Sequence, residues 1–351
     1  MLALCMIVKN EEKNIKICLS KVEAFVDEII IVDTGSTDNT KIIASKFTDK
    51  IYDFKWLNDF SKARNFSISK ASRDWVLVFD ADEFVTDFNI FNVDRFIKNS
   101  FNKNKVARIQ RLNIMEDSNG NKKYIERVNR LFNRNYFHYQ GIIHEQIVAL
   151  DGRTYGTEMV DITAEHLGYT NEVLNRTDKV KRNINLLEIA VKKNSEDPYL
   201  YFQLGKSHYL LKDYKTSALS FERALSFQLD FRLEYVEDLV ETYGYSLINS
   251  GRYSEALILE NCLPVYSKSA DFHFLMGLIY MNNAKFTQAV ESFIECTKFP
   301  HSKVEGITTY SAYYNIGVIY EVLDFREKAI EYYVMCGDYE PAKDRIKVKL
   351  G

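Results

Sequence analysis

The sequence feature that most constrains the fold is a run of five apolar residues followed at once by acidic ones. Residues 75–79 are Trp-Val-Leu-Val-Phe, and residues 80–83 are Asp-Ala-Asp-Glu. An uninterrupted apolar run is typical of a strand buried on both faces, as in a parallel sheet. Open α/β sheets bind ligands beyond the carboxyl ends of their strands, which is where Asp80 and Asp82 would lie. Two carboxylates there suit Mg²⁺ or Mn²⁺, whereas an isolated Asp-x-Asp is more often a solvated acidic turn.

Strand and helix patterns alternate before this run. Apolar stretches at residues 2–8, 28–32 and 51–54 predict strands, and each is followed by a helix-like segment. Such alternation predicts a mostly parallel sheet with right-handed crossovers. Polar residues follow the first two strands and would reach the same edge as the Asp-x-Asp, namely Asn10, Glu11 and Asp33. The sequence contains no Gly-x-Gly-x-x-Gly and no Walker-type loop, so it supports neither a dehydrogenase nor a P-loop enzyme.

Two polar residues of this region have both a structural and a functional interpretation. Asp33 precedes Thr-Gly-Ser and could simply form a turn, or its carboxylate could accept a hydrogen bond from a base or a ribose. Arg64 could be a solvated helix charge, or its guanidinium group could bind a diphosphate through two hydrogen bonds.

Four motifs occur together and in order, at residues 5–12, 31–40, 60–65 and 79–83. Together they resemble family 2 of the nucleotide-sugar glycosyltransferases, whose catalytic domain has the GT-A fold. More narrowly, they resemble a bacterial branch in which tetratricopeptide repeats follow the catalytic domain. That branch includes the peptide S-glycosyltransferases that modify bacteriocins.

The resemblance implies a role for each matching residue. The ends of the first two strands would bind the uracil base and ribose of a UDP-sugar, through Val8, Asn10, Glu11 and Asp33. Arg64 would reach the diphosphate. Asp80 would be shared between the ribose and the metal, and Asp82 would be the main metal carboxylate, with Mn²⁺ or Mg²⁺ as the metal.

Residues 84–170 are expected to complete the domain and face the acceptor. Residues 106–112 and 127–132 predict strands joined across a polar turn at 117–121. The segment Gly-Ile-Ile-His-Glu at 141–145 is similar to an element of the same branch. In an inverting transfer one base takes the proton of the acceptor, and Glu145 is the candidate; the alternative is an ion pair with a neighbouring Arg. His144 would touch the diphosphate or orient Glu145.

His166 lies in Glu-His-Leu-Gly-Tyr at residues 165–169, which matches a His-x-Gly-Tyr element of the same branch. A neutral imidazole is a plausible further ligand for Mn²⁺, so His166 joins Asp80 and Asp82 as a candidate metal ligand. The alternative is a structural histidine.

The second half of the chain has a different pattern. Residues 171–196 predict a linking segment with a helix that ends before Asp197-Pro198. Beyond it, small residues recur twelve positions apart, in the pairs Gly205/Ser217, Gly244/Ala256, Gly277/Ala289 and Gly317/Ala329. This spacing predicts about four tetratricopeptide helix pairs over residues 197–351. Their aromatic residues would form the core between repeats, while the concave face could bind a peptide or form a homodimer.

The composition excludes several classes of protein. A net charge of −3 gives no reason to expect nucleic acid or an anionic membrane as a partner. No segment has the length and apolarity of a membrane span or a signal peptide. Five scattered cysteines without metal-type spacing indicate buried thiols in a reducing compartment, so we expect a cytoplasmic protein.

We therefore expect an α/β GT-A domain over residues 1–170 and an all-α repeat domain after it. The resemblance implies an inverting, metal-dependent transfer of a hexosyl or N-acetylhexosaminyl group from a UDP-sugar, preferably to a peptide or protein. Two alternatives stay open: a glycan or lipid-linked acceptor in cell-surface polysaccharide synthesis, and an inactive repeat scaffold. Intact Asp33, Arg64, Asp80 and Asp82 argue against the scaffold.

Overall fold

The computed structural model describes residues 2–117, 120–169 and 179–350. The chain divides into two compact units, Met1–Leu186 and Leu187–Gly351. The division falls inside helix α6 (Lys179–Lys193), and the predicted boundary at residue 170 lies outside the described residues. Among the helices described, none combines the length and the apolarity needed to cross a bilayer.

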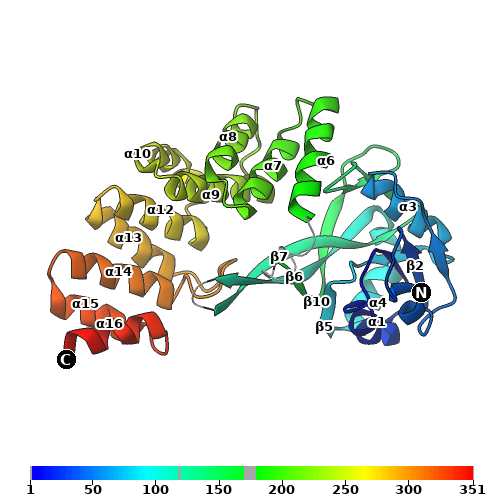
Figure 1. Ribbon diagram of the computed structural model, residues 1–351, viewed down its shortest axis with the longest axis horizontal. Helices are drawn as coiled ribbons and strands as arrows, with labels where there is room; N and C mark the ends of the chain where they lie inside the picture. Colours follow the sequence, from blue (N-terminus) through cyan, green and yellow to red (C-terminus); the bar gives the residue numbers. More distant parts are fainter. Residues whose placement is uncertain (1, 118–119, 170–178, 351) are drawn as a thin grey trace. The chain divides into compact units, whose positions relative to one another are not determined.

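The first unit is built on an eight-stranded sheet in the order β3-β2-β1-β4-β7-β6-β10-β5 (Figure 1). Neighbouring strands are parallel in four of the seven pairs and antiparallel in the other three, which confirms the predicted, mostly parallel α/β class. Strands β8 and β9 form a separate antiparallel ribbon. The strands are β1 (Leu2–Val8), β2 (Glu28–Asp33), β3 (Ile51–Asp53), β4 (Trp75–Val78), β5 (Glu83–Phe88), β6 (Lys105–Asp117), β7 (Gly120–Asn133), β8 (Phe137–Gln140), β9 (Gln146–Ala149) and β10 (Gly156–Tyr169).

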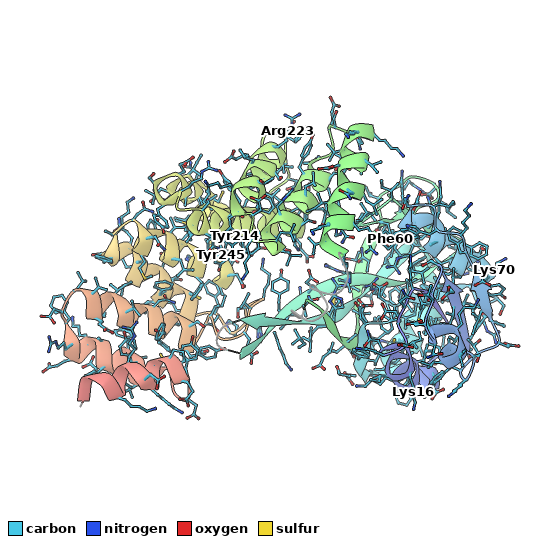
Figure 2. All side chains as sticks on the ribbon, in the orientation of Figure 1. Lys16, Phe60, Lys70, Tyr214, Arg223 and Tyr245 are labelled. Atoms are coloured by element: carbon cyan, nitrogen blue, oxygen red, sulfur yellow. The ribbon has the colours of Figure 1, made fainter. Side chains whose placement is uncertain are left out.

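Helices cover both faces of this sheet, because successive side chains of a strand point to opposite sides. Leu4 and Met6 of β1 belong to the core that α1 and α4 complete on one face. Ala3 and Cys5 belong to the core on the other face, with α3, whose ends are labelled at Phe60 and Lys70 in Figure 2. The helical segments of this unit are α1 (Ile15–Val22), η1 (Glu23–Phe25), α2 (Thr40–Ala44), α3 (Phe60–Lys70), α4 (Ile90–Lys98) and η2 (Ser100–Asn104).

The second unit is all helical and consists of consecutive antiparallel pairs. The pairs are α7 (Pro198–Leu210) with α8 (Tyr214–Leu225), α9 (Glu234–Asn249) with α10 (Tyr253–Ala256), η3 (Leu257–Cys262) and α11 (Leu263–Tyr266), α12 (Ala270–Asn282) with α13 (Phe286–Thr297), and α14 (Tyr310–Val322) with α15 (Arg326–Met335), followed by α16 (Glu340–Leu350). Four of the five cysteines are buried as expected, and Cys262 is half-buried instead because it lies on a partly exposed turn of η3.

Close contacts within each pair explain the predicted spacing of small residues. A Cβ atom added to Gly205 would lie 2.5 Å from the ring of Phe221, sixteen positions later. The same contact recurs at 2.6 Å between Gly277 and Phe293 and at 2.5 Å for Gly317 and Tyr333. Only glycine leaves room for the aromatic ring where the two helices of a pair cross.

The second pair departs from this pattern. Glu260 occupies the position where the other pairs have an aromatic ring, and leucine side chains fill the space beside Gly244. Its second helix is also broken into α10, η3 and α11, with Pro264 in the first turn of α11. Proline cannot donate the backbone hydrogen bond that a continuous helix would need at that point.

Candidate active site

The carboxyl ends of β1, β2 and β4 meet at one edge of the sheet. β1 pairs in parallel with β2, which places Val8 opposite Asp33, and with β4, which places Cys5 opposite Val78. The residues that follow these strands therefore converge, as in the ligand sites of other open α/β sheets.

Asp33 is buried at this edge with one carboxylate oxygen left over. Its Oδ1 accepts hydrogen bonds from the backbone N–H groups of Gly35 at 2.9 Å and Ser36 at 2.8 Å. Its Oδ2 is buried and has no hydrogen-bond partner among the described residues. A buried acceptor without a donor is costly. Oδ1 of Asp33 thus forms the turn, as one interpretation predicted, and Oδ2 is the atom that the other interpretation would use to bind a ligand.

The residues after β1 face the same edge. The Oδ1 atom of Asn10 accepts a hydrogen bond from the backbone N–H of Thr37 at 2.8 Å. The Glu11 carboxylate accepts one from Asn14 at 2.9 Å. Burial and the negative charges of Asp82 and Asp80 raise the pKa of Glu11 to about 7, against the opposing effect of that hydrogen bond. Glu11 therefore lies within the electric field of the Asp-x-Asp motif.

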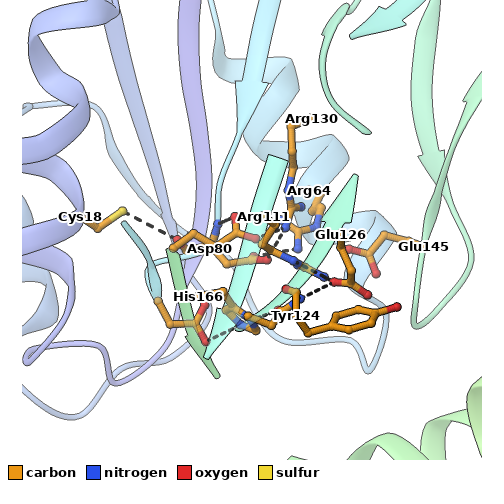
Figure 3. Close-up of polar contacts among 12 residues, drawn as sticks. Cys18, Arg64, Asp80, Arg111, Tyr124, Glu126, Arg130, Glu145 and His166 are labelled. Atoms are coloured by element: carbon orange, nitrogen blue, oxygen red, sulfur yellow. Dashed lines mark hydrogen bonds and ion pairs between the residues drawn. The ribbon is translucent and has the colours of Figure 1, made fainter. Parts of the chain in front are cut away.

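Both oxygens of Asp80 are bound by arginines (Figure 3). Arg64 Nη2 donates to Oδ1 at 2.8 Å, and Arg130 Nη2 donates to Oδ2 at 3.2 Å. Burial alone would raise the pKa of Asp80, but the two positive charges hold it well below its usual range. Arg130 also pairs with Glu83, which is fully buried and accepts the backbone N–H of Asp80 at 3.1 Å.

Arg64 also forms an ion pair with Glu145, and both side chains are about nine-tenths buried. Asn65, the next residue of α3, hydrogen-bonds both the backbone N–H and the backbone C=O of Tyr139, at 2.9 and 2.8 Å. The backbone N–H of Phe60 donates to the C=O of Ile142 at 2.9 Å. These bonds fasten the segment after β8 to α3 and so bring Glu145 to Arg64.

The turn that carries Glu145 depends on two residues with positive φ. Gly141 has φ 107°, a conformation that side chains rarely allow, and His144 has φ 47°. Gln146 donates a hydrogen bond to the backbone C=O of His144 at 2.9 Å.

Asp82 lies beside His166 and Lys179. The Oδ2 atom of Asp82 is 3.5 Å from His166 Nε2 and 3.5 Å from Lys179 Nζ. Burial alone would raise the pKa of Asp82, but the contacts with His166 and the charge of Lys179 lower it to about 2. The carboxylate is therefore ionised at neutral pH.

The orientation of His166 is fixed by Asn113 of β6. The amide nitrogen of Asn113 donates to Glu126 Oε2 at 2.8 Å, so its Oδ1 is the atom 2.8 Å from His166 Nδ1. Because a carbonyl oxygen only accepts, Nδ1 carries a proton, and Nε2 is the ring atom that faces Asp82. Arg111 in turn binds Glu126 at 2.6 Å and Glu83 at 3.1 Å.

The donor chemistry around Asp82 fits a divalent cation. An ionised carboxylate and an imidazole Nε2 atom converge, and the other ring nitrogen is held by an amide oxygen, as is usual for metal-binding histidines. Among the described residues, no group of three or more Asp, Glu, His or Cys side chains could hold a metal alone. Water molecules and the oxygen atoms of a phosphate ligand would therefore complete the coordination sphere.

Several residues of this site were not predicted from the sequence. Arg111 and Arg130 lie within the two predicted strands, and Asn113 lies one residue beyond the first of them, on the longer β6. Polar residues of a strand do not reveal which partner they meet. Lys179 is more than ninety positions from Asp82 in the sequence. Glu83 is part of the acidic run, yet it is the buried partner of two arginines rather than a ligand at the surface.

Comparison with known proteins finds two family matches in this chain. Residues 3–143 match the model of glycosyl transferase family 2, and residues 270–299 match a tetratricopeptide repeat. The first match includes Asp33, Arg64, Asp80 and Asp82. Glu145 and His166 lie beyond it.

Curated relatives match over 58% of the chain. The SPbeta prophage-derived glycosyltransferase SunS of Bacillus subtilis is 34% identical over 219 residues, which cover 58% of this chain and 48% of SunS. A TPR repeat-containing protein of Synechococcus elongatus is 32% identical over 211 residues, 58% of this chain and 51% of that protein. The chain thus spans about half the length of these relatives.

Among solved structures, the TPR protein YrrB, described as having an unusual peptide-binding site, superposes with a TM-score of 0.41 and 23% identity. The superposition covers 50% of this chain and 88% of YrrB. Residues 3–143 in the first unit thus resemble glycosyl transferase family 2, and residues 270–299 in the second resemble a tetratricopeptide repeat.

Proposed function

We propose that this chain is a metal-dependent, inverting glycosyltransferase that moves a sugar from a UDP-sugar to a peptide or protein side chain. The observation that carries the proposal is the meeting of two features at one sheet edge of a family 2 domain. Asp33 presents a buried oxygen without a partner among the described residues, and Asp82 and His166 form an incomplete metal site. A nucleoside diphosphate would supply a hydrogen-bond donor for Asp33 and phosphate oxygens for the metal.

The nucleotide would bind across this edge. The ring N–H of a uracil base is a donor of the kind that Asp33 Oδ2 needs, and cytosine lacks that proton. The Nη1 atom of Arg64 is buried and without a hydrogen-bond partner in the described part of the chain, so it can donate to a diphosphate oxygen. Lys179 adds a second positive charge beside Asp82.

Asp82 and His166 would hold Mn²⁺ or Mg²⁺, with Asp80 close by. When bound, the cation supplies positive charge that stabilises the leaving diphosphate. Each oxygen of Asp80 accepts one hydrogen bond from an arginine and keeps a second lone pair, through which Asp80 would take part.

Glu145 would accept the proton of the acceptor as that group attacks the sugar from the side opposite the diphosphate. The ion pair with Arg64 holds its carboxylate in place. The ion pair is the alternative interpretation of Glu145, and the proposed role is compatible with it, since a carboxylate paired with an arginine can still accept a proton. Arg64 would then contact the donor site and the base at once.

A peptide acceptor is supported by the repeat unit in the same chain, because stacked repeats form extended binding surfaces. SunS is a glycosyltransferase by its name, which supports transfer but identifies no acceptor.

The experiment is thermal unfolding of the purified chain with UDP, CDP, GDP and a panel of UDP-sugars, each with Mn²⁺ or with EDTA. A ligand that binds only the folded state adds about 2.7 kcal/mol to the free energy of unfolding when its concentration is a hundred times Kd, and it raises the melting temperature accordingly. We expect stabilisation by UDP and by one UDP-sugar, and we expect it to require Mn²⁺.

Two variants sharpen the test. Asp82→Asn should abolish the Mn²⁺-dependent stabilisation by UDP, while Asp87→Asn, an exposed change on β5, should leave it intact. Transfer of the labelled sugar is then assayed with peptide, glycan and lipid-linked acceptors. No stabilisation by any nucleotide would favour the inactive scaffold, and transfer to a glycan or lipid alone would reject the peptide acceptor.

A further inference from the structure

Within the repeat unit, three acidic side chains of α9 converge on one lysine. Lys303 lies in the connection between α13 and α14, and its Nζ atom is 2.7 Å from Glu241, 3.0 Å from Asp238 and 3.6 Å from Glu237. A fourth carboxylate, that of Asp271 in the first turn of α12, accepts the backbone N–H of Lys303 at 2.8 Å. We call Glu237, Asp238, Glu241, Asp271 and Lys303 the acidic cluster.

The inner carboxylates of the acidic cluster are buried, with Glu241 and Asp271 each 7% exposed. Burial raises the pKa of Glu241 well above its usual range; Lys303 opposes this shift, and the charge of Asp271 adds to it. Burial also raises the pKa of Asp271. Repulsion from neighbouring carboxylates adds to both shifts, from Asp271 and Asp238 on Glu241 and from Glu237 on Asp271, and a further positive charge would relieve that repulsion.

A second observation points to a ligand at the same place. Tyr266, at the end of α11, is 6% exposed, and its hydroxyl group is buried with no hydrogen-bond partner among the described residues. The hydroxyl interacts electrostatically with Glu237, Glu241 and Lys303, so it lies beside the acidic cluster. A buried hydroxyl without a partner costs free energy, and a bound ligand would recover it.

The outer part of the acidic cluster is open to solvent. The side chains of Glu237 and Lys303 are 26% and 25% exposed. They lie on and next to α9, which is on the inner side of the curve that the repeats trace (Figure 1). Tyr245, labelled in Figure 2, lies about two helical turns after Glu237 on α9. Its hydroxyl group interacts electrostatically with Glu241 and Asp271.

We infer that the acidic cluster binds an arginine side chain of a peptide partner. The carboxylate of Glu237, whose side chain is 26% exposed, is the farthest of the three from Lys303 Nζ. A planar guanidinium group carries five N–H donors, so it can bind this carboxylate and still has donors left for the phenolic oxygen of Tyr266, which has no partner among the described residues. This binding does not depend on sugar transfer and would exist in an inactive scaffold as well.

The probe is a fluorescein-labelled dodecapeptide of glycine and serine with two adjacent arginines. Its control replaces both arginines by citrulline, which has nearly the same shape but no charge. Binding to the full chain is measured by fluorescence anisotropy at about 50 mM salt, where charge pairing is only partly screened. We expect saturable binding of the arginine peptide and at least tenfold weaker binding of the citrulline peptide.

Three variants locate the site. Glu237→Gln should weaken binding of the arginine peptide at least tenfold, and Glu327→Gln, which removes an exposed carboxylate from α15, should change it less than twofold. Tyr266→Phe should weaken binding about threefold without lowering the melting temperature, because the hydroxyl it removes has no partner among the described residues.

Equal binding of the two peptides, or no binding of either, overturns the inference. So does binding by Glu237→Gln at the strength of the unchanged chain. An equal loss in Glu237→Gln and Glu327→Gln also overturns it, because the peptide would then respond to net charge rather than to this cluster.

Discussion

Asn113 and His166, 53 positions apart in the sequence, are joined by a hydrogen bond of 2.8 Å. The amide nitrogen of Asn113 is bound to Glu126, so the orientation of the amide and the position of the ring proton follow from one another. The imidazole therefore presents Nε2 to Asp82 without having to rotate, and β6 sets the geometry of a residue on β10.

Asn113→Ala should lower the affinity for Mn²⁺ about 10- to 100-fold, because partners that orient a metal-binding histidine typically contribute that much. The measurement is Mn²⁺ binding followed by electron paramagnetic resonance of the free ion. Asn135→Ala, which removes an exposed amide bonded to Asp74, is the matched control and should bind Mn²⁺ normally. Normal Mn²⁺ affinity in Asn113→Ala would mean that His166 needs no help from Asn113.

Glu145→Gln should slow turnover about 10²- to 10⁴-fold, the usual contribution of a general base, while the affinity for UDP changes less than twofold. Glutamine can still accept a hydrogen bond from Arg64 but cannot take a proton. Release of UDP from the UDP-sugar measures turnover even before an acceptor is known. Glu158→Gln breaks an exposed ion pair with Lys105 and serves as the control. An unchanged rate would leave Glu145 as a structural partner of Arg64 only.

Glu11→Gln should stabilise the metal-free chain at pH 8 but not at pH 4. The pKa of Glu11 is about 7 in the folded chain, above the 4.5 of an ordinary glutamate, so folding keeps a proton that the unfolded chain releases. This contribution makes stability fall as the pH rises from about 4.5 to 7, by about 3 kcal/mol in all. Glutamine does not titrate, so Glu11→Gln removes this contribution to the pH dependence of stability.

The measurement is urea unfolding in EDTA at several pH values, for the unchanged chain and for Glu11→Gln. Glu23→Gln, at an exposed position of η1, is the control. Parallel stability curves for the unchanged chain and Glu11→Gln would show that Glu11 is not in the field of Asp80 and Asp82.

Gly277→Ala should destabilise the repeat unit by up to about 2 kcal/mol. Alanine favours a helix by about 1 kcal/mol over glycine, but its Cβ would lie 2.6 Å from the ring of Phe293, and overpacking of a core costs about 1–3 kcal/mol. Urea unfolding gives the change. At Gly156 a Cβ meets nothing within 4 Å, so Gly156→Ala should be neutral. A stabilised Gly277→Ala would show that the ring can move aside.

The sequence predicted the elements whose signal is local. The first four strands are found within a residue or two of their expected bounds, because each is a short apolar run with polar ends. The repeat spacing is a local signal too, since the contact of Gly205 with Phe221 lies within one helix pair. Such patterns indicate that a segment is buried, but they do not depend on which other segment packs against it.

Contacts between distant segments were not predictable from these patterns. The long strand β10 brings His166 to Asp82, and β7 brings Arg130 to Asp80, but which strands become neighbours is decided by the whole sheet. The turn at residues 117–121 was predicted between β6 and β7, and residues 118–119 lie outside the described residues. The sequence therefore predicted each candidate ligand separately. Only the structure shows that Arg64 binds both Asp80 and Glu145 and that Arg130 binds Asp80.

The broken second helix of the second repeat has a consequence for cooperativity. A solenoid gains its stability from interfaces between nearest neighbours, so unfolding spreads along it one unit at a time. The segment from Tyr253 to Tyr266 lacks both a continuous helix and the aromatic contact of the other pairs. It is therefore the point at which such spreading would halt or begin, and it divides the array into two blocks that can open separately.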